Sequence, residues 1–241
     1  MPAAFAAEGP FPVEDGFLSV DLDQMTELVE EEGGVDLLYA PAGALNRFAE
    51  YNKLMIDQPE IWLDQDSIYR GVKPDNIKAI ADLIRERLIE RVTIRGYEVV
   101  DKPGPNVLYL RVALTNLYLK KEKRGILGYT PIGAAVKVGK DALRDMLSKV
   151  DIIEMALQAE WLDSQSEEVL GAIVIKRGAR KDKETGQKER RMDFVRFREV
   201  VEGYGARLAC RLDNTRQQVP QQIDCGDMKA LEAAGYFDLS E

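Results

Sequence analysis

Acidic side chains are the residues of this sequence whose type and spacing could carry out chemistry. Two groups lie on or just after stretches that alternate between apolar and polar residues: Asp57, Glu60, Asp64 and Asp66, and Glu154, Glu160 and Asp163. A pair of carboxylates can hydrolyse a glycosidic bond when the two groups are held roughly 5 to 9.5 Å apart. Acidic residues on an exposed sheet face are far commoner than such pairs. A solvated acidic face is therefore the first interpretation, and a carboxylate hydrolase is the alternative.

The chain contains no histidine. Within it, this excludes a Ser-His-Asp triad, a Cys-His pair, an HExxH zinc site and a facial iron triad. Acid–base chemistry would fall to carboxylates, lysine or tyrosine. From the sequence we assign no catalytic residue, no metal ligand and no cofactor.

A phosphate-binding loop is suggested by the segment 133–141, in which two glycines precede a lysine. The motif has one residue too many between its glycines, and Asp141 replaces the Ser or Thr that would hold magnesium. A carboxylate at that position would also repel phosphate. We interpret the segment as a loop without nucleotide-binding activity.

Three charged residues form a candidate polar sheet face. Arg111 stands on the mixed face of the strand expected at 106–121, while Glu154 and Glu160 stand on the polar face of the strand expected at 151–163. If the two strands are neighbours, pairing across them satisfies these charges. The alternative is that Arg111 extends to solvent over its own aliphatic stem. A functional polar groove on this face is a further interpretation.

Cys210 and Cys225 are the only cysteines of the chain. The segment 4–6 has the small-x-small pattern of a signal-peptidase site, which suggests an oxidising compartment, although a disordered alanine-rich tail explains it equally well. Turn-forming residues lie between the two cysteines, so the tail can fold back on the preceding helix. We predict a disulfide worth roughly 3 kcal/mol on the chain-entropy estimate. The alternative is a buried thiol at Cys210 and a free one at Cys225.

Composition and charge limit the partners. A formal net charge of -9 argues against nucleic acid, which requires a basic surface, and weakly against docking on anionic lipid. No apolar run approaches the roughly 18 to 20 residues that span a bilayer. We expect a protein or another envelope component as partner, with no transmembrane segment, and the sequence leaves the oligomeric state open.

The periodicity of the chain predicts an α/β (α+β) fold. Two long amphipathic helices are expected at 74–95 and 193–212, packed on one face of a mixed or antiparallel sheet. They should cover the face of the central strand that carries alternate apolar residues, namely Leu108, Leu110, Val112 and Leu114. A short helix is expected at 25–32.

Domain boundaries follow from the same pattern. Residues 16–212 are expected to form a single domain, because they contain every strongly periodic segment. Residues 1–15 are expected to be a disordered remnant of a signal or linker. Residues 213–241 should be a C-terminal tail docked on the domain.

Short motifs recur in a familiar order along residues 16–212. They are the segments 16–19, 51–62, 97–106, 110–115 and 158–164, which read GFLS, YNKLMIDQPEIW, YEVVDKPGPN, LRVALT and QAEWLDS. This order resembles the bacterial family called domain of unknown function 3313, whose members are mostly predicted envelope lipoproteins. The resemblance implies a location in the periplasm or outer membrane of a Gram-negative bacterium, and it brings no catalytic residue.

The sequence departs from this family at two places. The family usually turns its hairpin with Thr-Gly-Glu, where this chain has Ser166-Glu167-Glu168. The family usually carries a lipidated cysteine near its start, and here no cysteine precedes Cys210. We expect a non-enzymatic binding or assembly role in the cell envelope, with a carboxylate-based periplasmic hydrolase as the alternative.

Overall fold

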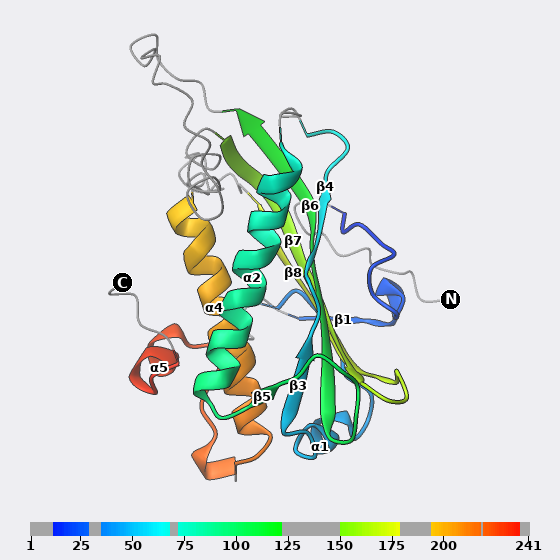
Figure 1. Cartoon of the computed structure of the whole chain (residues 1–241), viewed down its shortest axis with the longest axis vertical. Helices are drawn as coiled ribbons and strands as arrows, with labels where there is room; N and C mark the ends of the chain where they lie inside the picture. Colours follow the sequence, from blue (N-terminus) through cyan, green and yellow to red (C-terminus); the bar gives the residue numbers. More distant parts are fainter. Residues whose placement is uncertain are drawn as a thin grey trace.

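The computed structural model describes residues 12–28, 35–67, 72–121, 150–178, 194–217 and 219–236. A mixed sheet forms one layer, and the two long helices α2 (Pro74–Ile94) and α4 (Phe194–Asn214) pack side by side on one of its faces (Figure 1). This confirms the predicted fold class. The candidate phosphate loop lies outside the described residues.

The sheet has the strand order β1-β2-β8-β7-β6-β3-β5, with β4 also paired to β6. The strands are β1 (Thr26–Glu27), β2 (Leu37–Tyr39), β3 (Lys53–Ile56), β4 (Glu60–Leu63), β5 (Glu98–Val99), β6 (Val107–Lys121), β7 (Val150–Asp163) and β8 (Val169–Gly178). β3 and β4 run parallel to β6, whereas β6, β7, β8, β2 and β1 form an antiparallel series. The long strands β6 and β7 are therefore at the centre of the sheet.

The helix-facing side of β6 forms the main core. Leu108, Leu110 and Leu114 are each 1% exposed, and Val112 is also buried. They share one cluster with apolar residues of both long helices: Ile80, Ile84, Leu88 and Val92 of α2, and Phe197, Val201, Tyr204, Leu208 and Leu212 of α4. The predicted packing of both helices on this face is confirmed.

A bulge at Asn116 interrupts the alternation of β6. The register to β7 shifts between Thr115 and Tyr118, which lie on either side of the bulge.

 The φ of 51° at Asn116 lies in the left-handed region, as does the φ of 58° at Asn106 in the turn before β6. Asparagine tolerates this backbone better than most residues because its short side chain bonds locally. The extra residue returns Leu117 and Leu119 to the helix-facing core, where neither is exposed to solvent.

The two long helices approach each other closely at Gly205 of α4. A Cβ atom at this position would lie 3.0 Å from the Cγ atom of Arg91, which is tighter than ordinary packing. Arg91 passes this point to bind the buried carboxylate of Glu202 at 2.8 Å. Glycine inside a helix costs about 1 kcal/mol relative to alanine, and the close crossing with its ion pair is the structural reason for it here.

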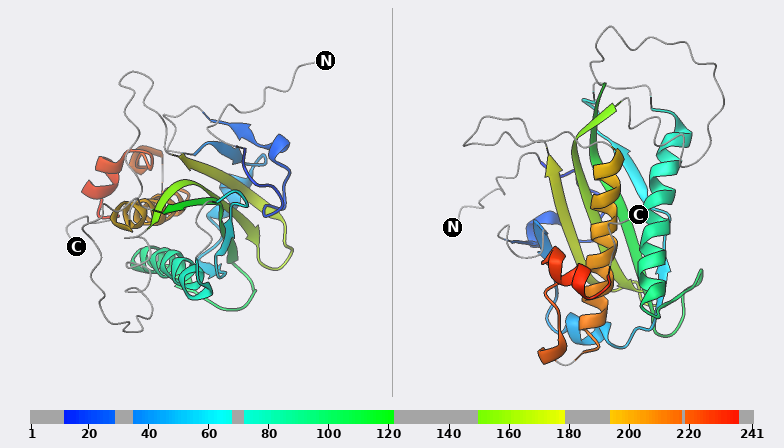
Figure 2. Two further views of the ribbon diagram at one scale, coloured as in Figure 1. Left: turned by 90° about the horizontal axis from the view of Figure 1, so that it is seen from above. Right: turned by 90° about the vertical axis from the view of Figure 1, so that its left-hand side faces the viewer.

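The other face of the sheet is covered by residues 12–25, which we call the N-terminal segment. This segment lies on the side of the sheet away from the helices (Figure 2). Its apolar residues Phe17, Leu18, Val20 and Met25 form a second cluster with residues of β2, β6 and β8. The sheet is therefore buried on both faces, and the chain has three layers at this point.

One sequence prediction about this segment is wrong. Instead of a helix at 25–32, Thr26–Glu27 forms strand β1, paired with Leu37–Leu38 of β2. The backbone bonds offered by the edge of the sheet outweigh the weak helix preference of a short segment. The remaining short elements are two 3-10 turns, Leu22–Gln24 and Val219–Gln221, and the helices α1 (Ala44–Phe48) and α5 (Met228–Ala233).

The β7–β8 hairpin places Glu167 in a left-handed conformation, with a φ of 59°. This is the position at which the resembled family usually has glycine. The turn is held by Asp163, whose carboxylate accepts hydrogen bonds from the backbone N–H groups of Gln165 and Ser166 at 3.0 and 2.8 Å. These bonds hold the pKa of Asp163 at about 2, well below its ordinary value. The turn thus keeps its geometry without the glycine.

The packing of β6 predicts the effect of Leu110→Ala. This change should lower the free energy of unfolding by about 2 to 5 kcal/mol, because it leaves a cavity under both helices. Leu63→Ala is the matched control, since Leu63 is 38% exposed, and it should cost less than about 0.5 kcal/mol. Equal losses for the two variants in denaturant unfolding would contradict the assignment of this core face.

The backbone at Glu167 predicts that Glu167→Gly stabilises the protein. Relief of the left-handed strain should exceed the extra entropy of glycine in the unfolded chain, giving a net gain of up to about 1 kcal/mol. Glu168→Gly, one residue later, should instead destabilise. Thermal unfolding of the two variants checks this, and a lower melting temperature for Glu167→Gly would show that the turn is not strained.

Candidate functional site

The structure brings together two of the three residues predicted to form a polar sheet face. Arg111 of β6 and Glu160 of β7 are directly opposite each other, and the Arg111 Nη1 atom donates to the Glu160 Oε1 atom. Glu154 lies beyond the bulge, opposite Tyr118 and Gly178, and does not join them. The structure therefore pairs Arg111 with Glu160 and places Glu154 further along β7.

The Arg111–Glu160 pair anchors the N-terminal segment. Glu160 is fully buried, and its carboxylate accepts hydrogen bonds from the backbone N–H and the hydroxyl of Ser19, at 2.8 and 3.0 Å. The Arg111 guanidinium lies 4.9 Å from the centre of the Phe17 ring. This part of the sheet face is consequently packed against the chain's own N-terminal segment. A functional polar groove on this face was one interpretation of the sequence.

Glu14 extends this anchored segment beyond the boundary expected from the sequence. Its N–H donates to the Oδ1 atom of Asn116 at 2.8 Å, and its carbonyl oxygen accepts from the Nε2 atom of Gln158 at 2.7 Å. The first of these bonds depends on the bulge, because the bulge turns the Asn116 side chain toward the N-terminal segment. Residues 13–15 thus belong to the packed domain, where the sequence placed them in a disordered remnant.

The acidic groups that could form a hydrolase are mostly occupied. Asp57 accepts a hydrogen bond from the Tyr109 hydroxyl at 2.7 Å, and Glu60 accepts one from the Trp62 indole at 2.9 Å. Glu154 and Asp64, one from each group, lie close enough to interact, and burial together with this repulsion raises the pKa of Glu154. Neither of them lines the cavity described next.

A cavity of about 590 Å³ lies beside α4, on the helix-facing side of β2, β7 and β8. Its walls are largely apolar and include Leu38, Phe48, Trp161, Leu170, Ile173, Leu208 and Leu212. Asn46, Arg211, Asn214, Thr215 and Gln222 supply its polar lining. Sites for small molecules typically have about 300 to 1,000 Å³ and this mixture of apolar walls with few polar groups. We call this space the main cavity.

A smaller inner pocket of about 40 Å³ adjoins the main cavity under α4. Trp161, Ile173, Leu208 and Arg211 line both spaces, so the two are adjacent. Tyr204 and Arg207 line the inner pocket but not the main cavity. Because these residues of α4 are spaced three or four apart, they present a single stripe of the helix to the sheet.

Three polar atoms around the inner pocket are buried without a hydrogen-bond partner among the described residues: the Tyr204 hydroxyl, the Trp161 Nε1 atom and the Arg207 Nε atom. An unsatisfied buried polar group costs about 1 to 3 kcal/mol. Burial raises the pKa of Tyr204, so this phenol keeps its proton at neutral pH. All three groups can therefore donate a hydrogen bond to a ligand.

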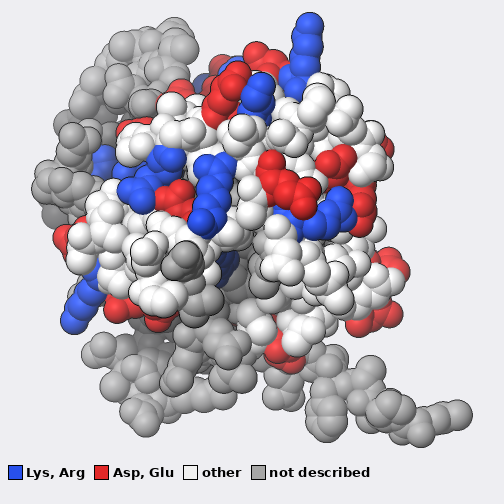
Figure 3. Space-filling model, turned by 90° about the horizontal axis from the view of Figure 1, so that it is seen from below, with Lys and Arg blue, Asp and Glu red and all other residues white. Residues whose placement is uncertain are grey.

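Arginines concentrate at this pocket although the whole chain is acidic. Burial lowers the pKa of both Arg207 and Arg211, and each lies near another arginine. Arg177 at the end of β8 approaches Arg207, with Asp36 as the nearby carboxylate, 3.8 Å from the Arg177 Nη1 atom. Elsewhere, on the surface seen from below in Figure 3, basic and acidic side chains are interspersed. Arg207 and Arg211 thus both line the inner pocket.

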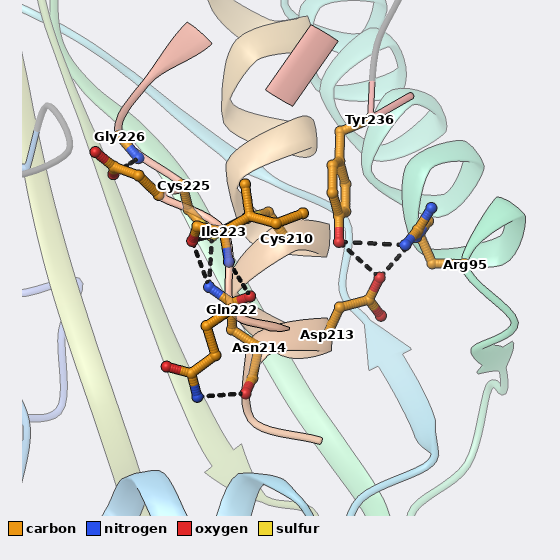
Figure 4. The surroundings of a disulfide bond; sticks show 10 residues. Arg95, Cys210, Asp213, Asn214, Gln222, Ile223, Cys225, Gly226 and Tyr236 are labelled. Atoms are coloured by element: carbon orange, nitrogen blue, oxygen red, sulfur yellow. Dashed lines mark hydrogen bonds and ion pairs between the residues drawn. A yellow bond between two sulfur atoms is a disulfide. The ribbon is translucent and has the colours of Figure 1, made fainter. Parts of the chain in front are cut away.

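The C-terminal tail forms one wall of the main cavity and is held by a disulfide between Cys210 and Cys225 (Figure 4). Asn214 donates through its Nδ2 atom to the Ile223 carbonyl oxygen at 2.7 Å and accepts from the Ile223 N–H at 3.0 Å. The Gln222 Nε2 atom donates to the Asn214 carbonyl oxygen at 3.0 Å. The disulfide predicted from the sequence therefore also positions two polar groups of the cavity.

A second contact ties the tail to both long helices. The Asp213 carboxylate accepts hydrogen bonds from the Arg95 Nε atom at 2.6 Å and from the Tyr236 hydroxyl at 2.9 Å (Figure 4). Burial and this bond raise the pKa of Tyr236 to about 12. Tyr236 is itself 2% exposed, so the described part of the tail is held at Cys225 and at Tyr236.

Sequence reasoning missed the main cavity and its arginines. A signal was present, because Arg207 and Arg211 fall on the same helical face as the apolar stripe. Charged residues at core-facing positions are rare unless they are paired or functional.

The described residues contain no cluster of three or more His, Cys, Asp or Glu side chains that could hold a metal ion. Among the helices of the same residues, none is long and apolar enough to cross a membrane. The main cavity and its inner pocket are consequently the candidate site that we carry forward.

Comparison with known proteins gives a family match and distant structural likenesses. Residues 14–208 match the family described as "Protein of unknown function (DUF3313)". No curated protein matches the chain.

Three solved structures illustrate the distant likenesses. They are a PelC dodecamer from Paraburkholderia phytofirmans (12% identity, TM-score 0.34, 75% of this chain and 95% of that chain), protein XCC0632 of family DUF330 from Xanthomonas campestris (12%, 0.34, 72% and 92%), and a neuraminyllactose-binding hemagglutinin homolog from Helicobacter pylori (12%, 0.29, 53% and 65%). With TM-scores below 0.5, none of them establishes a shared fold or function.

Replacing each of the two glutamates of β7, Glu160 and Glu154, by glutamine should have different effects on the free energy of unfolding. Glu160→Gln should lower the free energy of unfolding by about 3 kcal/mol, because it leaves Arg111 without its buried partner. Glu154→Gln is the matched control and should change stability by less than about 0.5 kcal/mol, because burial already disfavours its charge. A Glu160→Gln variant as stable as the control in urea unfolding would show that the pair does not anchor the segment.

Proposed function

We propose that this chain, which belongs to the DUF3313 family of proteins of unknown function, is a non-enzymatic binding protein of the bacterial cell envelope. The main cavity beside α4 is its binding site. The observation that carries the proposal is an apolar space of about 590 Å³ that adjoins buried hydrogen-bond donors without partners.

The chemistry of the cavity supports binding over catalysis. Among the described residues, neither the lining of the main cavity nor that of the inner pocket contains an Asp, Glu, Lys or Cys side chain, and the hydroxyl groups of Tyr39, Tyr204 and Thr215 have no carboxylate or lysine beside them in the lining. A tyrosine or threonine hydroxyl needs such a neighbour to be activated for acid–base or nucleophilic catalysis. The lining can enclose and orient a molecule, but it offers no group suited to transforming one.

The disulfide supports a location outside the cytoplasm. Disulfides persist in oxidising compartments such as the periplasm and are rare where thiols are kept reduced. The Cys210–Cys225 bond closes a separation of 15 residues and holds the tail that forms a wall of the binding site. Periplasm or outer membrane of a Gram-negative bacterium is the location that we propose, in agreement with the motif resemblance.

A carboxylate-based periplasmic hydrolase is the second candidate. One observation favours it: the pKa of Glu154 is raised, with Asp64 nearby. A raised pKa on one of two neighbouring carboxylates is the pattern expected of a general acid. The binding role is preferred because neither of these two residues lines the cavity.

The binding role predicts that protein isolated from the envelope carries a small molecule. Native mass spectrometry should show an added mass on the wild-type chain. Leu38→Trp, which fills the cavity from β2, should abolish it, whereas Leu63→Trp on the exposed end of β4 should retain it. An added mass that is equal in the two variants, or absent from the wild type, would contradict the proposed site; thermal unfolding confirms that both variants are folded.

The proposed location predicts the state of the two cysteines in cells. After alkylation without reductant, protein released from the periplasm should carry no alkyl group, because both thiols are consumed in the disulfide. Protein that is deliberately kept in the cytoplasm should carry two alkyl groups, because both thiols stay reduced there. Two alkylated thiols in the periplasmic sample would overturn both the disulfide and this argument for the location.

A further inference from the structure

We infer that the ligand of this cavity is an anionic amphiphile: one acyl chain in the main cavity, with a carboxylate or phosphate head group at the inner pocket. The inference deepens the proposed function and rests on it. It is carried by two independent features, the apolar walls of the main cavity and the set of unpartnered donors beside it.

The donors select the charge of the head group. The unpartnered atoms of Tyr204, Trp161 and Arg207 are all N–H or O–H groups, and a buried donor is satisfied by an acceptor. An ionised carboxylate or phosphate offers acceptor oxygens and no donor. Hydrogen bonds to such a charged group are stronger than those to a neutral group. A ligand with an ammonium head group would offer no acceptor to these donors.

The arginines select the same charge. Arg207 and Arg211 line the inner pocket, and Arg177 lies near Arg207. In a partly buried site their field is screened less than it would be at the surface. The acidic character of the whole chain disfavours adsorption to an anionic membrane, but it does not prevent this local pocket from holding a single anionic molecule.

The remaining walls of the main cavity favour an acyl chain as the apolar part of the ligand. Leu38, Phe48, Leu170 and Ile173 present apolar surface to the main cavity, and each methylene group buried there is removed from water. The polar groups Asn214 and Gln222, fixed by the disulfide-held tail, lie on the same cavity. A free inorganic anion would leave the apolar walls uncovered, and a neutral hydrocarbon would leave the donors unsatisfied.

The test compares four probes with the same chain: dodecanoate, dodecyl phosphate, dodecanol and dodecyltrimethylammonium. In the Trp62→Phe protein, Trp161 is the remaining tryptophan, and it lines the cavity, so its fluorescence reports binding. Each probe is titrated below its critical micelle concentration. Dodecanoate and dodecyl phosphate should bind about tenfold or more tightly than the other two, as expected for one hydrogen-bonded charge.

Variants assign this preference to the pocket. Arg207→Met keeps the apolar stem but removes the charge, and it should abolish most of the preference for the anions, whereas Arg85→Met on α2 should not. Tyr204→Phe is the second variant, used if Arg207→Met does not fold, and it should weaken the anions while leaving dodecanol unchanged. Leu38→Trp should abolish binding of all four probes, which is measured by calorimetry because this variant adds a second tryptophan to the cavity.

The outcomes separate the inference from the proposed function. Equal binding of dodecanol and dodecanoate, or an anion preference that survives both Arg207→Met and Tyr204→Phe, would overturn the inference while the cavity remains a binding site. Failure of all four probes would overturn it too, and a cavity-dependent mass on envelope-isolated protein would then still support the proposed function. Binding that Leu38→Trp leaves intact would contradict both.

Discussion

Two helices are too few to cover one face of this sheet, and the candidate site follows from that mismatch. Neighbouring strands lie about 4.8 Å apart and packed helices about 8 to 10 Å apart, so two helices cover about four strands. The sheet described here has β2 and β8 beyond that width, next to α4. The short helix α1 and the disulfide-held tail close the margin only in part, which leaves the main cavity.

The opposite face meets the same requirement in another way. Its apolar and charged residues are covered by the N-terminal segment, which binds Glu160, Gln158 and Asn116 through bonds between residues more than 100 positions apart. Burying the Glu160 carboxylate is costly unless every acceptor is used. The segment supplies these partners, so the ion pair and the segment each depend on the other.

Periodicity was sufficient for the parts of the fold that depend on local pattern. The two long helices, the central strand and its core face of alternating leucines follow from spacing. The disulfide was predicted from the signal-like segment 4–6 and the turn formers between the cysteines, with two unpaired thiols as the alternative. The bulge at Asn116 was not predicted, because an extended strand gives no sign of where a residue will be inserted. The covering of Arg111 and Glu160 was missed because the contacts are long-range. The cavity was missed because it depends on the width of the sheet, which no segment encodes by itself, although Arg207 and Arg211 on the core-facing stripe were a usable sign.

The most direct test of the account is a crystal structure of the protein isolated from the envelope without delipidation. The account predicts elongated density along Leu38, Phe48 and Ile173 in the main cavity, ending in a head group within hydrogen-bond distance of Arg207 or Tyr204. A cavity closed by the chain's own side chains, with the donors of Tyr204, Trp161 and Arg207 satisfied internally, would contradict it.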